Sequence, residues 1–274
     1  MDSRPPPDPA RDTHPSSDPL PARRLFGLTL RAVTLSETTA WLLEAGARRQ
    51  RPAWVVVTPN VDHLVRLDAD PAFRQAYAQA DLVFADGMPV VWASRLLGQP
   101  LPGRVTGADL FVELARGAAA QGLGIFVLGG QPGQEAALAA SFARVYPGLR
   151  VDIHAPSMQF DPLGAEAEEA VRRVNAARPA FVFTCLGSPK QERWALGHRE
   201  RIDAAAILCV GAAMEFALGI KRRAPHWMRN AGLEWAWRLA SEPRRLWRRY
   251  LVQGLRFVPL VWRERAAQRA ARRR

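Results

Sequence analysis

The chain has 274 residues, of which 48% are hydrophobic and 23% charged, enough to bury the core of one large α/β domain or two small ones. It contains neither an apolar N-terminal signal core nor a run of about 18 apolar residues, so we expect a cytoplasmic protein without a membrane-spanning helix. The net charge of +12 is unevenly distributed: residues 221–274 hold 16 Lys and Arg against 3 Asp and Glu, whereas residues 1–220 hold 22 against 23. The basic C-terminal segment predicts a polyanionic partner, either nucleic acid or an anionic membrane surface.

The chain divides into three regions that differ in composition and hydrophobic pattern. Residues 1–24 are rich in Pro, Asp and Ser and predict a disordered leader. Residues 25–220 alternate between apolar strands and periodic helices, and we assign them to one catalytic domain. The predicted strands are 54–58, 81–85, 124–128, 150–154, 181–186 and 206–210. The predicted helices are 37–50, 60–77, 89–97, 108–121, 133–145, 165–177 and 190–199. This order indicates an α/β fold with a mostly parallel, Rossmann-like sheet covered by helices.

Polar residues follow two of the predicted strands, where the ligands of such sheets bind. Thr58 and Asn60 come after the first strand, and Asp86-Gly87 follows the second. A carboxylate at Asp86 faces the expected ligand crevice and could accept a proton as a general base. The alternative is that Asp86 caps the helix that begins near Pro89.

Glycine turns open two further helices, at Gly129-Gly130 and at Gly187-Ser188. Glycines before a helix allow backbone N–H groups to approach a diphosphate, although such turns are also common for structural reasons alone. Neither GxGxxG nor a P-loop motif is present. Asp68-Ala69-Asp70 follows a helical run rather than a strand, which favours a solvated helix end over a metal site, and the histidines lack zinc spacing. We therefore predict no protein-bound metal and no cofactor.

Residues 221–274 predict a helical appendage that contains five of the nine tryptophans. Interleaved Trp and Arg suit a bilayer interface, where rings lie at headgroup depth and guanidinium groups meet phosphates. The alternatives are a solvated basic face, or tryptophans packed into the catalytic core. We expect Trp235 and Trp237 to be partly core, and Trp227, Trp247 and Trp262 to lie nearer lipid.

Seven motifs occur in one order along the chain: TPNVDHL, ADLVFADGMPVVWASRLLG, RVTGADL, FVLGG, FTCLGSPKQERW, VGAAMEFALGIKRRAPHWM and GLEWAWRLASEPRRLWRRY. Together they resemble the WecG/TagA/CpsF glycosyltransferases (glycosyltransferase family 26) from about Leu25 to about Val261. The resemblance implies an inverting transfer from a UDP-sugar to a polyprenyl-diphosphate-linked saccharide, in the synthesis of teichoic acid, surface polysaccharide or exopolysaccharide. The implied donors carry N-acetylmannosamine, its uronic acid or a related hexose.

The resemblance also assigns residues. It implies that Asp86 is the catalytic base. The substrate-binding residues that we predict from the matching motifs and turns are Thr58, Asn60, Gly87, Arg104, Gly107, Gly129, Gly130, Gly187, Gln191, Arg222 and Arg223. The chain departs from the family pattern at Val61-Asp62 and at Met214-Glu215, where the family often has Phe-Asp, and this departure leaves the identity of the sugar open.

The predicted partners are thus a UDP-sugar, a polyprenyl-diphosphate-linked acceptor and, through residues 221–274, the inner face of the cytoplasmic membrane. A UDP-hexose such as UDP-glucose is the alternative donor. A basic nucleic-acid-binding protein is a remote alternative, because it leaves the loops at Asp86 and Gln191 unexplained, and we predict no nucleic-acid partner. A nucleotide-dependent oxidoreductase is disfavoured because GxGxxG is absent.

Overall fold

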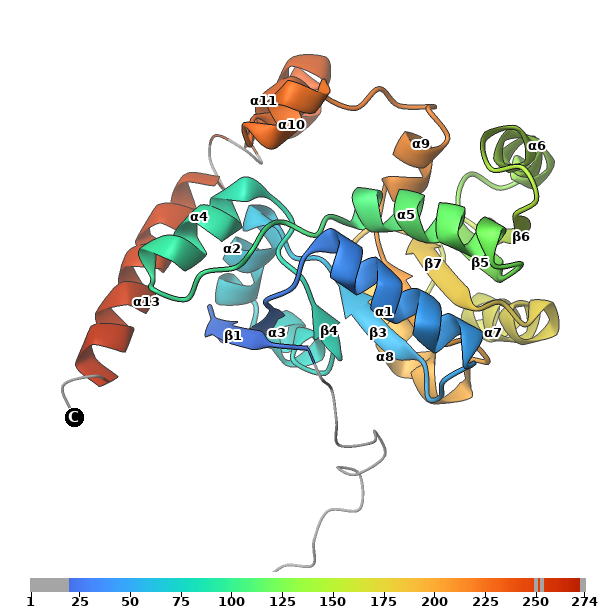
Figure 1. Ribbon diagram of the computed structural model, residues 1–274, viewed down its shortest axis with the longest axis horizontal. Helices are drawn as coiled ribbons and strands as arrows, with labels where there is room; N and C mark the ends of the chain where they lie inside the picture. Colours follow the sequence, from blue (N-terminus) through green and yellow to red (C-terminus); the bar gives the residue numbers. More distant parts are fainter. Residues whose placement is uncertain (1–19, 249–250, 252–253, 272–274) are drawn as a thin grey trace, which may run out of the picture.

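A single mixed sheet organises the computed structural model, which describes residues 20–248, 251 and 254–271 (Figure 1). Its strands lie in the order β1-β2-β4-β3-β8-β7-β5-β6. All neighbouring pairs are parallel except the β1–β2 hairpin. The bounds are β1 Ala22–Leu25, β2 Leu28–Arg31, β3 Trp54–Val57, β4 Leu82–Val83, β5 Gly124–Gly129, β6 Arg150–His154, β7 Phe181–Cys185 and β8 Ala206–Cys209. The predicted α/β fold with a mostly parallel sheet is confirmed.

The six predicted strands correspond to β3–β8, whereas the hairpin was not predicted. β1 begins at Ala22, so the last residues of the segment that we assigned to the leader belong to the sheet. Residues 1–19 of that segment lie outside the described residues.

The helices before the appendage are α1 Leu35–Ala47, α2 Val61–Ala69, α3 Pro71–Tyr77, α4 Met88–Leu96, α5 Gly107–Ala120, α6 Glu135–Val145, α7 Ala165–Ala177, α8 Lys190–His198, η1 Arg199–Arg201 and α9 Ala213–Ala217. The helix predicted over 60–77 is two helices, because Asp70 accepts a hydrogen bond from the Phe73 N–H and Pro71 begins α3. Asp68 pairs with Arg74 and Arg263. The Asp68-Ala69-Asp70 segment is therefore a helix end, as expected.

Two apolar layers cover the two faces of the sheet. Successive strand residues point to opposite faces, so Val55 and Val57 join one layer and Trp54 and Val56 the other. Helices α2, α3, α4, α7 and α8 complete the first layer, and α1, α5, α6 and α9 complete the second. Burial on both faces explains why the strands are continuous apolar runs.

The described helices of the C-terminal segment are α10 His226–Asn230, α11 Glu234–Ser241, α12 Pro243–Trp247, η3 Gly254–Arg256 and α13 Phe257–Ala271. The last of them packs against the catalytic domain. Phe257 stacks at 5.5 Å from Phe26, and Leu260 and Val261 join the core layer formed by α2 and α4. No helix within the described ranges is long and apolar enough to cross a bilayer.

Candidate active site

Asp86 lies directly after β4, at the carboxyl edge of the sheet. Its N–H donates to the Pro59 carbonyl at 3.0 Å, and the neighbouring Ala85 carbonyl accepts from the Val105 N–H at 2.9 Å. These bonds fix the end of β4 between the loop that follows β3 and the loop that precedes α5. The residue that caps α4 is Gly87, at φ +111, and no side chain caps that helix. The alternative helix-capping role of Asp86 is therefore wrong, and its carboxylate is available to interact with a ligand.

The surroundings of Asp86 disfavour its ionised form relative to a carboxyl group in water. Burial and the negative charge of Glu234 raise the pKa of Asp86 to about 7, while the positive charges of Arg104 and Arg238 limit the increase. A carboxyl group that titrates near the working pH is suited to proton transfer, because a base is most effective when its pKa lies close to that pH.

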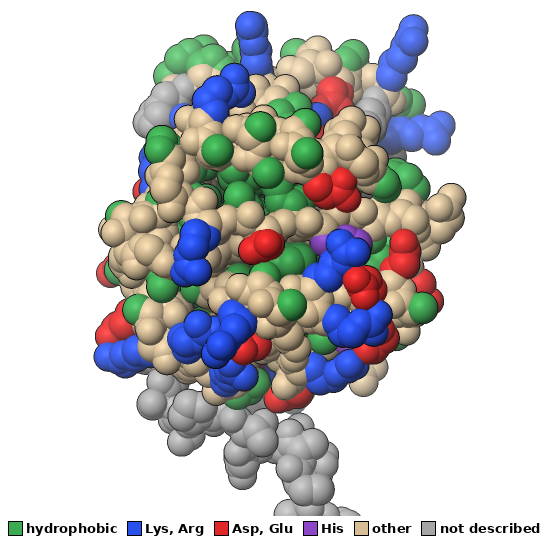
Figure 2. Space-filling view, turned by 90° about the vertical axis from the view of Figure 1, so that its right-hand side faces the viewer, with side chains coloured by type: hydrophobic (Ala, Val, Ile, Leu, Met, Phe, Trp, Pro, Cys, Tyr) green, Lys and Arg blue, Asp and Glu red, His purple; other side chains and the backbone are tan. Residues whose placement is uncertain are grey.

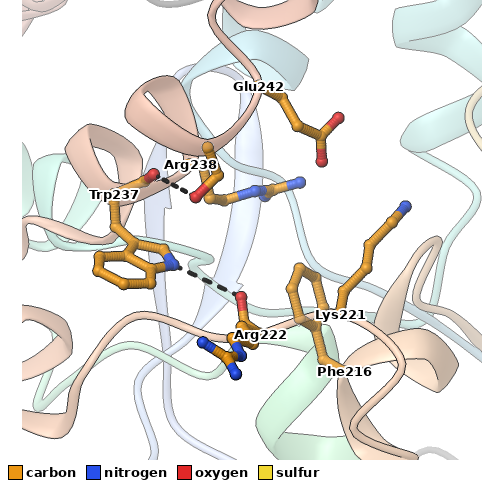
Figure 3. Close-up of a pocket in the computed structure, with 7 residues that line it drawn as sticks. Phe216, Lys221, Arg222, Trp237, Arg238 and Glu242 are labelled. Atoms are coloured by element: carbon orange, nitrogen blue, oxygen red, sulfur yellow. Dashed lines mark hydrogen bonds between the residues drawn. The ribbon is translucent and has the colours of Figure 1, made fainter.

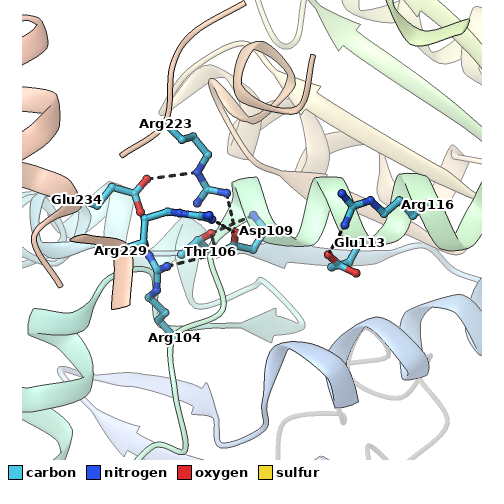
Figure 4. A network of polar contacts seen from close by, with 8 residues as sticks. All are labelled: Arg104, Thr106, Asp109, Glu113, Arg116, Arg223, Arg229 and Glu234. Carbon is cyan, nitrogen blue, oxygen red and sulfur yellow. Dashed lines mark hydrogen bonds and ion pairs between the residues drawn. The ribbon is translucent and has the colours of Figure 1, made fainter. Parts of the chain in front are cut away.

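A network of charged side chains joins the appendage to α5 beside Asp86 (Figure 4). Asp109 binds Arg223 at 2.6 Å and lies 3.7 Å from Arg229, while Arg104 binds Glu234 at 2.9 Å. All five side chains are at most 23% exposed. Burial alone would raise the pKa of Asp109, but the hydrogen bond and charge of Arg223 outweigh it and lower that pKa. The network therefore holds α10 and α11 in one position over the site.

Gln191 and Glu192 occupy the start of α8, at the same edge of the sheet. The Gln191 Oε1 accepts from the Gly211 N–H at 2.9 Å, and its Nε2 donates to Glu192 Oε1 at 3.0 Å. Both side chains are buried, and burial raises the pKa of Glu192. Gln191 thus fixes the loop that follows β8, and Gly187, at φ +78, forms the turn that precedes α8.

The remaining predicted residues have identifiable packing roles. Asn60 caps α2 by accepting from the N–H groups of Asp62 and His63. A Cβ at Gly129 would lie 2.7 Å from the Cys185 carbonyl oxygen, and one at Gly130 would lie 2.9 Å from Leu138. At Gly107, the first residue of α5, it would approach the buried Thr58 Oγ1 to 3.2 Å. All three positions therefore leave little room for a side chain.

A pocket of about 280 Å³ lies between the α9 region and α11 (Figure 3). Its lining residues are basic or aromatic for the most part: Phe216, Lys221, Arg222, Trp237, Arg238, Ser241 and Glu242. Arg238 lies 5.6 Å from the Phe216 ring, and its positive charge also lowers the pKa of Asp86, so one residue of the pocket acts electrostatically on the candidate base. Such a lining suits an anionic ligand with a planar group.

The structure separates the two predicted tail arginines. Arg222 is exposed and lines the pocket, whereas Arg223 is held by Asp109. Sequence reasoning missed Asp109, Glu234 and Arg238. They lie within the RVTGADL and GLEWAWRLASEPRRLWRRY motifs, but the motifs alone did not indicate which of their members face one another. Within the described ranges, no three His, Cys, Asp or Glu side chains are grouped to hold a metal ion.

The expected difference among the tail tryptophans is found only in part, because neither Trp235 nor Trp237 belongs to the buried core. Trp227, Trp247 and Trp262 are 65%, 45% and 57% exposed, whereas Trp235 is 39% exposed and Trp237 is partly buried beside Arg222, whose carbonyl accepts from its indole N–H. Whether the exposed rings meet lipid stays a prediction.

A profile of the glycosyl transferase WecG/TagA/CpsF family matches residues 23–271. Relatives from Staphylococcus aureus strains MW2, NCTC 8325 / PS 47 and COL are 30% identical over 195 residues, which cover 70% of this chain and 74% of each relative. Each of them is an N-acetylglucosaminyldiphosphoundecaprenol N-acetyl-beta-D-mannosaminyltransferase. The chain belongs to the WecG/TagA/CpsF family of glycosyltransferases, and the resemblance drawn from the seven motifs is confirmed.

Proposed function

We propose that this WecG/TagA/CpsF-family transferase moves N-acetylmannosamine from a UDP-sugar to a polyprenyl-diphosphate-linked N-acetylglucosamine, with inversion and with Asp86 as the base. The observation that carries the proposal is the carboxyl group of Asp86, poised near pKa 7 at the ligand-binding edge of the sheet. The names of the relatives support this acceptor and this sugar over UDP-glucose as donor.

The proposed reaction is a single displacement. An acceptor hydroxyl attacks the anomeric carbon of the donor while the bond to UDP breaks on the opposite face. Asp86 accepts the hydroxyl proton, and UDP leaves with the bonding electron pair. With an α-linked donor this displacement yields a β-linked product, in agreement with the beta-D-mannosaminyl activity of the relatives.

Negative charge builds on the leaving diphosphate, and the basic pocket offers a place for it. Lys221, Arg222 and Arg238 surround this pocket beside Asp86. Cationic groups held in advance at the position where charge develops lower the barrier by several kcal/mol in typical enzymes. We assign this role to the pocket together with the Gly129-Gly130 and Gly187-Ser188 turns, and propose turnover without a bound metal.

The acceptor carries a polyprenyl chain, so the enzyme works at a membrane. We assign its attachment to residues 221–274, peripheral to the inner face of the cytoplasmic membrane. Each basic residue near an anionic surface contributes about 1 kcal/mol, which makes a net +13 segment sufficient for binding.

The test is release of UDP from a panel of UDP-sugars with a short-chain lipid-diphosphate N-acetylglucosamine acceptor. We expect UDP-N-acetylmannosamine to be the preferred donor and Asp86→Asn to lower the rate about 100-fold or more. A preference for UDP-glucose would overturn the choice of sugar, and an unchanged rate in Asp86→Asn would overturn the base. The chelator EDTA should leave turnover near normal, and recovery only with added Mg²⁺ or Mn²⁺ would contradict the metal-free chemistry.

A further inference from the structure

An apolar surface continues from the appendage onto the catalytic domain itself. On α4 the residues that reach solvent are Trp92, Arg95 and Leu96, spaced so that they share one side of the helix. Trp92 is 46% exposed and Leu96 50% exposed, whereas Val90, Val91 and Ala93 on the same helix are buried. Solvent-exposed Trp and Leu side by side on a helix that is otherwise well packed indicate an interaction surface.

Helix α13 presents a matching side. Leu255 of the preceding η3 and Val258 and Trp262 of α13 recur at helical spacing and are 70%, 52% and 57% exposed. Phe257, Leu260 and Val261 on the opposite side of α13 are buried. Beyond Trp262 the exposed side becomes basic, and Arg265 lies 5.7 Å from the Trp262 ring.

The two helices lie at the same end of the molecule (Figure 1). Their inner sides belong to one core layer, which contains Val90 and Val91 of α4 as well as Phe257 and Leu260 of α13. The exposed side of each helix is therefore turned away from that layer. The turn before α11 also meets α4, because a Cβ on Gly232 would lie 2.9 Å from the Trp92 ring. We call this surface, formed by Trp92, Arg95, Leu96, Leu255, Val258 and Trp262, the α4–α13 face.

The chemistry of this face fits a lipid surface. Helix α4 contains no acidic residue, and Glu264 of α13 is partly buried. The opposite end of the molecule differs, because acidic and basic side chains are intermixed on the lower half of that surface (Figure 2). Ion pairs there join Glu169 of α7 to Arg172 and Arg173. The exposed carboxylate next to α13 is Asp68, and Arg263 neutralises it. Large apolar side chains bordered by arginines match a bilayer with anionic headgroups better than they match a second copy of this chain, which would bring like charges together.

We propose that the α4–α13 face lies on the bilayer, so that the catalytic domain contacts lipid through α4 as well as through its appendage. This inference rests on the proposed function. Helix α4 begins two residues after Asp86, and its nine residues span about 13 Å at 1.5 Å per residue. Contact of Trp92 and Leu96 with lipid would hold Asp86 within about 13 Å, the length of α4, of the headgroups. The acceptor sugar is joined through a diphosphate to a polyprenyl chain buried in the bilayer, so it lies just outside the headgroups, within reach of Asp86.

A site-specific label tests the contact directly. Leu96→Cys in the full chain is labelled with an environment-sensitive dye, with Met158→Cys as the matched control, because Met158 is 74% exposed on the loop after β6. Cys209 is buried and Cys185 partly buried, and labelling of the unsubstituted chain measures their reactivity. With phosphatidylcholine–phosphatidylglycerol vesicles, we expect the emission at position 96 to shift to the blue and its aqueous quenching to fall several-fold, with no change at 158. Vesicle-bound protein in which position 96 stays as quenchable as 158 would overturn the proposal. Protection of position 96 that rises with protein concentration in the absence of vesicles would show a second copy instead, and would overturn it too.

A paired variant separates this proposal from the enzymatic one. Leu96→Ala with Val258→Ala should lower partitioning into the same vesicles about tenfold, which corresponds to about 1.4 kcal/mol, while Met158→Ala leaves it unchanged. Transfer to a water-soluble short-chain acceptor should stay at the parental rate, and transfer to a vesicle-embedded acceptor should fall about tenfold. Equal loss on both acceptors would contradict a docking role. If no sugar is transferred by any form of the protein, the proposed function fails, whereas the label at position 96 still decides whether α4 meets lipid.

Discussion

Asp86 owes its character to groups from three parts of the chain. The end of β4 places its carboxyl group at the crevice, burial disfavours its charge, and Glu234 from α11 opposes ionisation further. Arg104 and Arg238 act in the other direction, so the pKa settles at about 7. A carboxyl group at this balance is half ionised at neutral pH and responds to any change in the position of α11.

The first prediction concerns the pH dependence of catalysis. Only the ionised form of Asp86 can accept a proton, so kcat/KM should increase as the pH rises through about 7 and level off above it. Arg238→Gln removes a charge that lowers this pKa, so the midpoint should move to higher pH. The measurement is a pH profile of UDP release between pH 5 and about 9. A flat profile across this range would contradict the assignment of Asp86.

The second prediction concerns stability. The pKa of Asp86 is raised from 3.8 to about 7 in the folded protein, so the folded state binds the proton more tightly and stability falls as the pH rises between these values. The shift corresponds to about 4 kcal/mol at most. Contact of the partly exposed carboxyl group with solvent lowers this figure, and we expect Asp86→Asn to stabilise the fold by about 1–2 kcal/mol at pH 8 and by little at pH 4. Thermal unfolding at the two pH values measures the difference, and Asp62→Asn on the surface of α2 is the control.

The position of Asp86 was predictable because it depends on a local pattern, an apolar strand followed by Asp-Gly. Its capping role could not be judged from the sequence, because that depended on Gly87 adopting φ +111 and serving as the cap itself. The influence of Glu234 and Arg238 on Asp86 could not be predicted either. Both residues lie about 150 positions away along the chain, and only the folded appendage brings them near.

At the scale of elements, the site is assembled where α10 and α11 dock on the start of α5. Asp109 lies in the first turn of α5 and collects the charges of Arg223 and Arg229. Helical periodicity predicted α5, and the C-terminal segment was predicted to be helical without individual bounds. The contact between α5 and α11 depends on the path of residues 219–233, which no local pattern specifies. The contact was therefore not predictable from the pattern.

The third prediction tests this contact. Arg223→Gln leaves Asp109 without its 2.6 Å partner and should weaken the docking of α10 and α11 by about 2–3 kcal/mol, since removal of one partner from a buried pair exposes the other to a desolvation penalty. The matched control is Arg116→Gln on α5, the helix that carries Asp109. The exposed pair of Arg116 with Glu113 contributes at most about 0.5 kcal/mol. Limited proteolysis within 221–248 should accelerate in the first variant and not in the second. Equal cleavage rates would show that the ion pair does not hold the appendage.

The fourth prediction concerns the turn after β5. Gly129→Ala would place a Cβ 2.7 Å from the backbone oxygen of Cys185 at φ +142, so β5 and β7 would have to separate, and we expect a loss of about 3 kcal/mol or more. Gly133→Ala, at φ +82 with no atom within 4 Å, should cost only about 1 kcal/mol of backbone strain. Chemical denaturation of both variants measures the two values. A similar small loss in both would indicate that the turn relaxes and that glycine at 129 serves a ligand instead.

At the scale of the whole molecule, the C-terminal segment is both surface and core. Composition identified its basic charge, and its tryptophans suggested a lipid interface, because both properties can be counted along the chain. The packing of α13 against the β1–β2 hairpin and α2 could not be predicted from composition. It depends on a contact between Phe26 and Phe257, which are separated by most of the chain.

The fifth prediction follows from this double role. Deletion of residues 221–274 removes Arg223, Glu234 and Arg238 from the site, so activity and vesicle binding should be lost together. The same deletion uncovers Phe26 and the α2 side of the core, and loss of folding would produce the same result.

A milder variant separates the two causes. Arg265→Gln with Arg269→Gln changes only the basic end of α13, beyond the buried side chains. It should weaken binding to anionic vesicles about 30-fold, at about 1 kcal/mol for each of the two charges, and leave transfer to a soluble acceptor unchanged. If this variant binds anionic vesicles as tightly as the parent, the basic end of α13 is not part of the lipid contact, and attachment must come from the other basic residues of 221–274 or from the apolar side chains of the α4–α13 face.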